Sequence, residues 1–325
     1  LCLYLMNQMR DYYKMNNRIK RVFSKLKYYW KENKQFILKY LYVGIISFLV
    51  KESKKEAELR KQKIRKFKQL TKGKREIVFD MNYGRGVKTK IILPVEDEGL
   101  SVDLLNDKIR EPLQVKWMLE LLKPNMAVID IGANLGYYLL MEAQIVKEVY
   151  GIEPNPVTFN YLKQSVKLNK LKNVKLFNLG IADKKSSLPF YISKHLNWSR
   201  FDKKAILHDT DVKEVIIKVD SLDNLFKDKN IDLVRMDVEG YEKYIFRGME
   251  NVIKNNPGLL IVIEFHSNLF NMQERREFIK WLKKNRLRIN YLSTGKLKTT
   301  QKNPNPQKIM NFLNNCHMVL ERDNP

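Results

Sequence analysis

The chain contains few cysteines, and they lie far apart. Cys2 and Cys316 are the only two among 325 residues, and they are not spaced as a metal-binding pair. This pattern excludes a disulfide-stabilised scaffold and a structural zinc site. It is typical of the reducing cytoplasm, where we expect this protein, either free or at a membrane surface.

Acidic residues are scarce at the start of the chain. Residues 1–75 carry 22 Lys or Arg and 5 Asp or Glu, whereas the remaining 250 residues carry 39 basic and 31 acidic groups. The first segment therefore accounts for most of the net charge of +25. We expect a basic helical extension over residues 1–75, a strand-rich connection over 76–114 and the main domain over 115–325.

A hydrophobic run long enough to cross a membrane is also missing. The apolar stretch at 36–50, which holds one lysine, would measure roughly 22 Å as a helix, less than the roughly 30 Å hydrocarbon core of a bilayer. Within 19–30, apolar residues at helical spacing are surrounded by basic ones. We expect residues 10–75 to contact an anionic membrane surface. A cover within the protein or within a dimer is the alternative.

The glycines of a dinucleotide-binding fingerprint are absent from the most informative motif. Residues 128–131 predict a buried strand, followed by a tight glycine turn and the start of a helix. Such a unit opens nucleotide-binding α/β folds. A dinucleotide site would need glycine where Asn134 and Tyr137 stand, and Asp130 would repel a phosphate. These residues suit a cationic cofactor without phosphate, which is S-adenosylmethionine.

A second acidic strand end follows at the expected distance. Glu153 ends an apolar run and is followed by prolines that stop the strand. In nucleoside-binding folds an acid at this place accepts hydrogen bonds from both ribose hydroxyls. A third strand at 173–179 leads to an alanine and an acid that would frame adenine. The predicted cofactor-binding residues are Asp130, Gly132, Ala133, Asn134, Gly136, Glu153, Asn155, Ala182 and Asp183.

Several motifs together resemble the FkbM-type methyltransferases, a family within the S-adenosylmethionine-dependent class. They are Asp-Ile-Gly-Ala-Asn-Leu-Gly at 130–136, Gly-Ile-Glu-Pro-Asn at 151–155, Val-Asp-Ser-Leu-Asp at 219–223, Arg-Met-Asp-Val-Glu-Gly-Tyr-Glu at 235–242 and Ile-Glu-Phe-His at 263–266. The Asp-Val-Glu-Gly element is the most specific, and the resemblance spans residues 110–322. It implies methyl transfer, usually to a hydroxyl oxygen of a sugar, polyketide or other small molecule. Arg235 stands where relatives often carry Lys or Ile, a change that we expect to have little effect.

The alternation of strands and helices predicts a Rossmann-like α/β fold of class I methyltransferases, with a seven-stranded, mostly parallel sheet. The fourth and fifth sheet strands are expected at 231–236 and 259–264. Segments 288–292 and 316–321 would supply the closing antiparallel pair. An insert of two strands is expected between 188 and 219. Acceptor specificity usually resides in such an insert, and we expect Trp198 and its neighbours at 195–200 to contact a sugar face.

The catalytic candidates lie at the carboxyl ends of the fourth and fifth strands. Asp237 is the first candidate for base or acceptor positioning, with Glu239 beside it if the strand continues. His266 is the candidate general base because its ordinary pKa is near neutrality. We expect no metal ion; a divalent cation held by these two carboxylates and the histidine is the alternative. Glu242 is expected only to favour the start of the next helix, and His317 to be structural.

Two other functions remain open. The basic extension and its tyrosines would suit RNA, so RNA methylation is one alternative, although no RNA-binding module is readable and Asp-Val-Glu-Gly fits it poorly. The other is an interaction protein that keeps the fold without catalysis. The leading hypothesis is an O-methyltransferase acting on a glycan, glycolipid or related small molecule. The sequence leaves the acceptor and the oligomeric state open.

Overall fold

The described part of the chain begins within the basic extension. The computed structural model describes residues 55–325 apart from 194–195, 203–211, 295–299, 312–314 and 323–325. Residues 55–70 form a helix, as predicted for the extension. The segments at 19–30 and 36–50 lie outside the described residues. No helix among the described residues is long and apolar enough to cross a membrane.

The central sheet has the predicted strands in the order typical of class I methyltransferases. Its order is β12-β11-β13-β10-β9-β3-β4-β5. The strands are β3 (Ala127–Ile131), β4 (Glu148–Ile152), β5 (Val174–Phe177), β9 (Leu233–Met236), β10 (Leu260–Phe265), β11 (Leu287–Thr294), β12 (Gln301–Lys302) and β13 (Cys316–Arg322). Strands β5, β4, β3, β9 and β10 are parallel, and β13 is antiparallel to both β10 and β11. The seven expected strands are confirmed, and the two-residue β12 extends the edge to eight.

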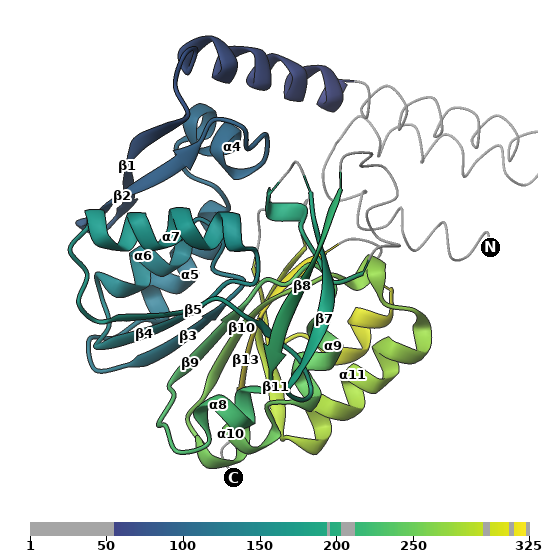
Figure 1. The fold of residues 1–325 in the computed structure, drawn as a ribbon. Helices are drawn as coiled ribbons and strands as arrows, with labels where there is room; N and C mark the ends of the chain where they lie inside the picture. The colour runs from purple at the N-terminus through teal and green to yellow at the C-terminus, as the bar shows by residue number, and fades with distance from the viewer. Residues whose placement is uncertain (1–54, 194–195, 203–211, 295–299, 312–314, 323–325) are drawn as a thin grey trace, which may run out of the picture. The chain divides into compact units, whose positions relative to one another are not determined.

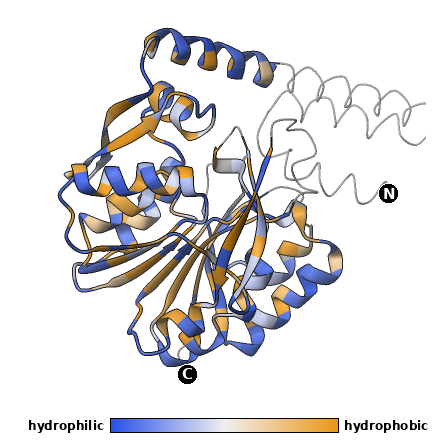
Figure 2. Ribbon diagram, in the orientation of Figure 1, coloured by the Kyte–Doolittle hydropathy of each residue, from blue (hydrophilic) through white to orange (hydrophobic). Residues whose placement is uncertain are grey.

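Helices cover both faces of this sheet (Figure 1). One layer contains α5 (Pro112–Leu121), α6 (Tyr137–Ala143) and α7 (Pro156–Leu168). The other contains α8 (Leu222–Phe226), α9 (Glu242–Arg247), α10 (Glu250–Asn255) and α11 (Met272–Lys284). Neighbouring strand residues alternate between the layers: Val128 packs in the α5–α7 core and Ile129 in the α8–α11 core. Figure 2 accordingly shows hydrophobic strands between helices whose outer faces are hydrophilic.

Two smaller sheets are separate from the main sheet. A hairpin of β1 (Glu76–Gly84) and β2 (Val87–Pro94), followed by α4 (Leu100–Asp107), precedes the parallel strands. The predicted insert forms a small sheet of β6 (Gly180–Ile181), β8 (Lys213–Asp220) and β7 (Ser186–Ile192). Short 3₁₀ turns occur at η1 (Leu196–Trp198), η3 (Ser267–Leu269) and η4 (Pro306–Asn311). The insert lies on the side of the carboxyl ends of the parallel strands, where α/β folds hold their ligands.

Candidate active site

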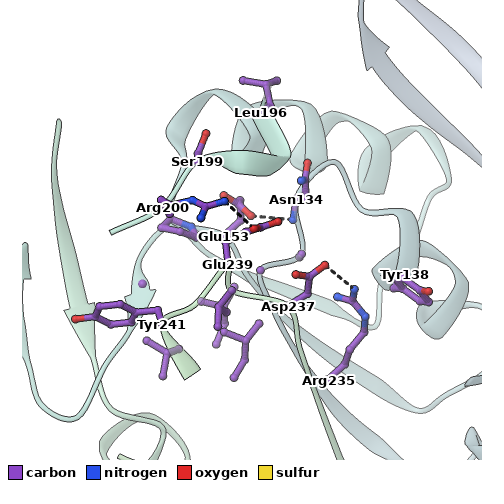
Figure 3. A pocket seen from close by; sticks show the side chains of 18 of the residues that line it. Asn134, Tyr138, Glu153, Leu196, Ser199, Arg200, Arg235, Asp237, Glu239 and Tyr241 are labelled. Carbon is purple, nitrogen blue, oxygen red and sulfur yellow. Dashed lines mark hydrogen bonds and ion pairs between the residues drawn. The ribbon is translucent and has the colours of Figure 1, made fainter. Parts of the chain in front are cut away.

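An open cleft lies at the carboxyl ends of β3, β4 and β9, where parallel α/β sheets bind ligands. It encloses about 900 Å³, including its open mouth. The turn after β3, the end of β4, the loop after β9 and the insert all contribute to its walls (Figure 3). Of the predicted cofactor residues, Gly132, Ala133, Asn134 and Glu153 line it. Gly180 and Ile181, which immediately precede the predicted Ala182 and Asp183, line it in their place.

The turn after β3 requires glycine because the loop after β9 passes directly against it. Gly132 has a φ of +77°, and a Cβ at this position would lie 2.0 Å from the carbonyl oxygen of Asp237. The Asp237 N–H donates to the carbonyl oxygen of Ile131 at 3.1 Å. The ends of β3 and β9 are thus joined backbone to backbone, and only glycine fits between them. Gly136 has a φ of +99° at the start of α6, outside the lining of the cleft.

Glu153 occupies the position predicted for the ribose-binding acid. Its two carboxylate oxygens accept from the backbone N–H groups of Asn134 and Asn155, each at 2.8 Å. Burial raises the pKa of Glu153 to about 7, against the lowering effect of these hydrogen bonds. Asn155 also caps α7, since its side chain accepts from the N–H of Val157. Asn155 therefore positions the acid, whereas Glu153 itself faces the cleft.

Asp130 is bonded to an arginine rather than exposed to the cleft. It is fully buried, and Arg235 donates from Nη1 to its Oδ1 at 2.7 Å. Burial raises the pKa of Asp130, and Arg235 opposes this effect. The guanidinium of Arg235 also lies 3.9 Å from the centre of the Tyr138 ring and lines the cleft. The residue expected to matter little thus separates the predicted acid from the ligand space.

Asp237 and Glu239 both face the cleft, although the strand does not continue through them. β9 ends at Met236, and Glu239 takes a φ of +52°, a left-handed conformation unusual for a residue with a side chain. This turn directs Glu239 to the same side as Asp237. Burial raises the pKa of Asp237 to about 6, while Arg235, 3.6 Å away, opposes the rise and Glu239 adds to it. Arg200 donates to Glu239 at 2.8 Å, as Figure 3 shows.

His266 lies behind these carboxylates and is not among the residues that line the cleft. It is 2% exposed, and its Nδ1 lies 2.5 Å from Oε1 of Glu242, which is itself fully buried. Its Nε2 lies 3.4 Å from Glu239 and 3.9 Å from Glu264. Burial lowers the pKa of His266, but Glu242 and Glu239 together raise it well above its ordinary value. Glu242 is thus a buried partner of this histidine as well as an acid in the first turn of α9.

Several residues of the site were not predicted. Arg110 and Glu111 line the cleft and form an ion pair at 2.9 Å, and Glu111 accepts from the hydroxyl of Tyr138. No sequence signal identifies this pair, because it precedes the first parallel strand and belongs to no motif. His317 faces Glu111 and Glu264, and burial lowers its pKa to about 4. Trp198, predicted to contact the acceptor, is 50% exposed in the insert.

Comparison with known protein families gives a match that covers most of this domain. The family model described as the methyltransferase FkbM domain matches residues 130–317. Among curated proteins, the chain is 44% identical over 52 residues to a tRNA(Phe) (4-demethylwyosine(37)-C(7)) aminocarboxypropyltransferase of Methanocaldococcus jannaschii. That match covers 15% of this chain and only 21% of the relative.

Solved structures with a similar arrangement include an FkbM methyltransferase from Methylobacillus flagellatus KT. It is 13% identical, and the match covers 67% of this chain and 53% of that one, with a TM-score of 0.38. Another is TYW2 from M. jannaschii in complex with AdoMet, which is 17% identical. That match covers 77% of this chain and 87% of the other, with a TM-score of 0.36.

Proposed function

The chain belongs to the FkbM family of S-adenosylmethionine-dependent methyltransferases, and from this premise we propose that it methylates a hydroxyl oxygen of a glycan, glycolipid or related small molecule. The observation that carries the choice of oxygen is the pair of carboxylates, Asp237 and Glu239, in the wall of the cleft. Carboxylates accept hydrogen bonds from hydroxyls and take up the proton that an alcohol must lose.

The cleft residues fit the methyl donor. Glu153 has both oxygens fixed by backbone N–H groups, so its remaining lone pairs can accept from a ribose diol. Gly132, Ala133 and Asn134 line the cleft beside it, on the turn that follows β3. The acids around the cleft also suit a sulfonium cation. When bound, S-adenosylmethionine supplies an electrophilic methyl group, and the protein's part is to orient the acceptor and exclude water.

We assign different tasks to the three catalytic candidates. Asp237 accepts the hydrogen bond of the acceptor hydroxyl and then its proton, because its Oδ1 is buried and has no hydrogen-bond partner among the described residues. Glu239, held by Arg200, orients the same hydroxyl or its neighbour. His266 is a positioning residue in this assignment, since it does not line the cleft and its Nε2 lies 3.4 Å from Glu239.

Transfer of a labelled methyl group from the cofactor into a fractionated cell extract, followed by identification of the product, tests this proposal. Asp237→Asn keeps the shape of the side chain and should lower turnover by on the order of 100-fold or more. Asp228→Asn makes the same chemical change at an exposed position and should leave turnover unchanged. Label found on a nitrogen atom of the product, or full turnover in folded Asp237→Asn, would contradict the assignment.

RNA is the second candidate acceptor. The curated relative acts on a tRNA, as its name states, and residues 1–75 are strongly basic. Protein purified without nuclease should then carry nucleic acid, seen as high absorbance at 260 nm, and labelled methyl should appear in RNA.

We further propose that residues 10–75 contact anionic membranes; salt-sensitive flotation with anionic vesicles tests that contact.

A further inference from the structure

Three potential metal ligands converge from two neighbouring strand ends. Asp237 and Glu239 follow β9, and His266 follows β10; the two strands are parallel, with Met236 opposite Ile263. One ligand atom from each of the three side chains lies within 4.8 Å of the others. Two carboxylates and an imidazole are a donor set that suits first-row divalent cations such as Mn²⁺.

The orientation of His266 supplies an independent indication of a ligand. Its side chain is 3% exposed, and its Nε2 has no hydrogen-bond partner among the described residues. On the other side of the ring, Nδ1 lies 2.5 Å from the buried Glu242. When an ion displaces the Nε2 proton, Nδ1–H still donates to Glu242, and the Nε2 lone pair is directed at the cluster. Metal-binding histidines usually have this arrangement, in which a carboxylate fixes the tautomer from behind.

The local charge also favours a divalent cation. Four carboxylates surround His266 or belong to the cluster: Asp237, Glu239, Glu242 and Glu264. Arg200 lies 2.8 Å from Glu239, and Arg235 lies 3.6 Å from Asp237 but is bonded to Asp130 at 2.7 Å. Carboxylates held this close together repel one another. A divalent ion between them would offset that repulsion.

We propose that Asp237, Glu239 and His266 bind one divalent cation of the Mn²⁺ type, with Glu242 orienting the histidine. Because three protein ligands leave coordination positions free, the ion could take a hydroxyl oxygen of the acceptor as a further ligand and lower that hydroxyl's pKa. That catalytic use rests on the proposed function, whereas the binding of the ion does not. Arg200 competes for Glu239, so its removal should favour the ion.

Binding of Mn²⁺ to the full chain, stripped of metal with chelator, tests the proposal through the loss of the free-ion electron paramagnetic resonance signal. The wild-type protein should bind one ion. Asp237→Asn and Glu239→Gln, which keep side-chain shape, should each weaken binding at least about tenfold, and Glu242→Gln by about tenfold. Arg200→Gln should strengthen it. Glu277→Gln, at an exposed acid on α11, is the matched control and should bind as the wild type does.

Two results would overturn this assignment. One is the absence of Mn²⁺ binding at millimolar concentration in the wild-type protein. The other is binding that survives in the Asp237→Asn, Glu239→Gln double variant but is lost in Glu264→Gln, because Glu264 belongs to a neighbouring group with Glu111 and His317. Ion binding without any methyl transfer would refute the proposed function alone. Methyl transfer in the presence of chelator by protein that binds no Mn²⁺ would refute the cation site alone.

Discussion

Replacement of Glu153 by glutamine should stabilise the ligand-free protein at alkaline pH while weakening its hold on the cofactor. The pKa of Glu153 rises from 4.5 to about 7 on burial. Between these values the folded protein keeps a proton that the unfolded chain releases, so the stability that Glu153 contributes falls as the pH rises through this window. At 1.36 kcal/mol per unit, the charged form costs about 3 kcal/mol at pH 8.

Glutamine carries no charge, so the variant should escape this cost. In wild type, the N–H groups of Asn134 and Asn155 each donate to one oxygen of Glu153. Glutamine has an NH₂ group in place of one oxygen, so one of these N–H groups loses its acceptor, at a cost of about 1–3 kcal/mol. That mismatch is present at every pH and therefore cancels when two pH values are compared. We expect the stability of Glu153→Gln relative to wild type to improve by about 2–3 kcal/mol from pH 5 to pH 8.

Urea denaturation of both ligand-free proteins at the two pH values measures this difference, because other titrating groups are common to both. Calorimetry with S-adenosylmethionine should show at least about tenfold weaker binding to the variant, since hydrogen bonds to a charged acceptor are lost. An identical pH dependence of unfolding in both proteins would show that Glu153 is not a buried charge. Unchanged affinity for the cofactor would remove it from the binding site.

Two further substitutions test the frame of the site. Gly132→Ala should lower the free energy of unfolding by about 2–4 kcal/mol in thermal denaturation, because its Cβ would meet the Asp237 carbonyl oxygen at 2.0 Å. Gly258→Ala, which has open space around its Cβ, should change the free energy of unfolding by no more than about 0.5 kcal/mol. Equal effects of the two substitutions would contradict the close approach. Arg235→Gln should cost about 3–5 kcal/mol in urea denaturation by leaving Asp130 buried without its partner. A second change, Asp130→Asn, should recover part of that loss, and no recovery would mean that the pair is not coupled.

The features that depend on local sequence were predictable. The glycine turn at Gly132 follows from a strand, a turn and a helix in sequence, and Glu153 follows from its spacing and the prolines after it. Both signals are local in the sequence. They also predict a shared site, because the carboxyl ends of neighbouring parallel strands lie together whatever segments connect them. The closing antiparallel pair was expected because it is usual in this class of methyltransferases.

The partners of these residues were not predictable, because they come from distant parts of the chain. Arg235 neutralises Asp130 across 105 residues, and Arg200 reaches Glu239 from the insert. The left-handed turn at Glu239 replaces the strand continuation that was expected, and no residue type announces it. Periodicity reports which face of an element is buried; it does not report which charge will lie opposite.

The close approach of Gly132 to the Asp237 carbonyl oxygen has a mechanical consequence. The turn expected to hold the methyl donor and the loop expected to hold its recipient share one rigid backbone junction, so neither can shift alone. Binding of a ligand to the turn should therefore change the position of the loop, and the reverse, without the movement of a lid. Diversification of substrate preference among related enzymes would then be expected in the inserted strands, which can vary without breaking that junction.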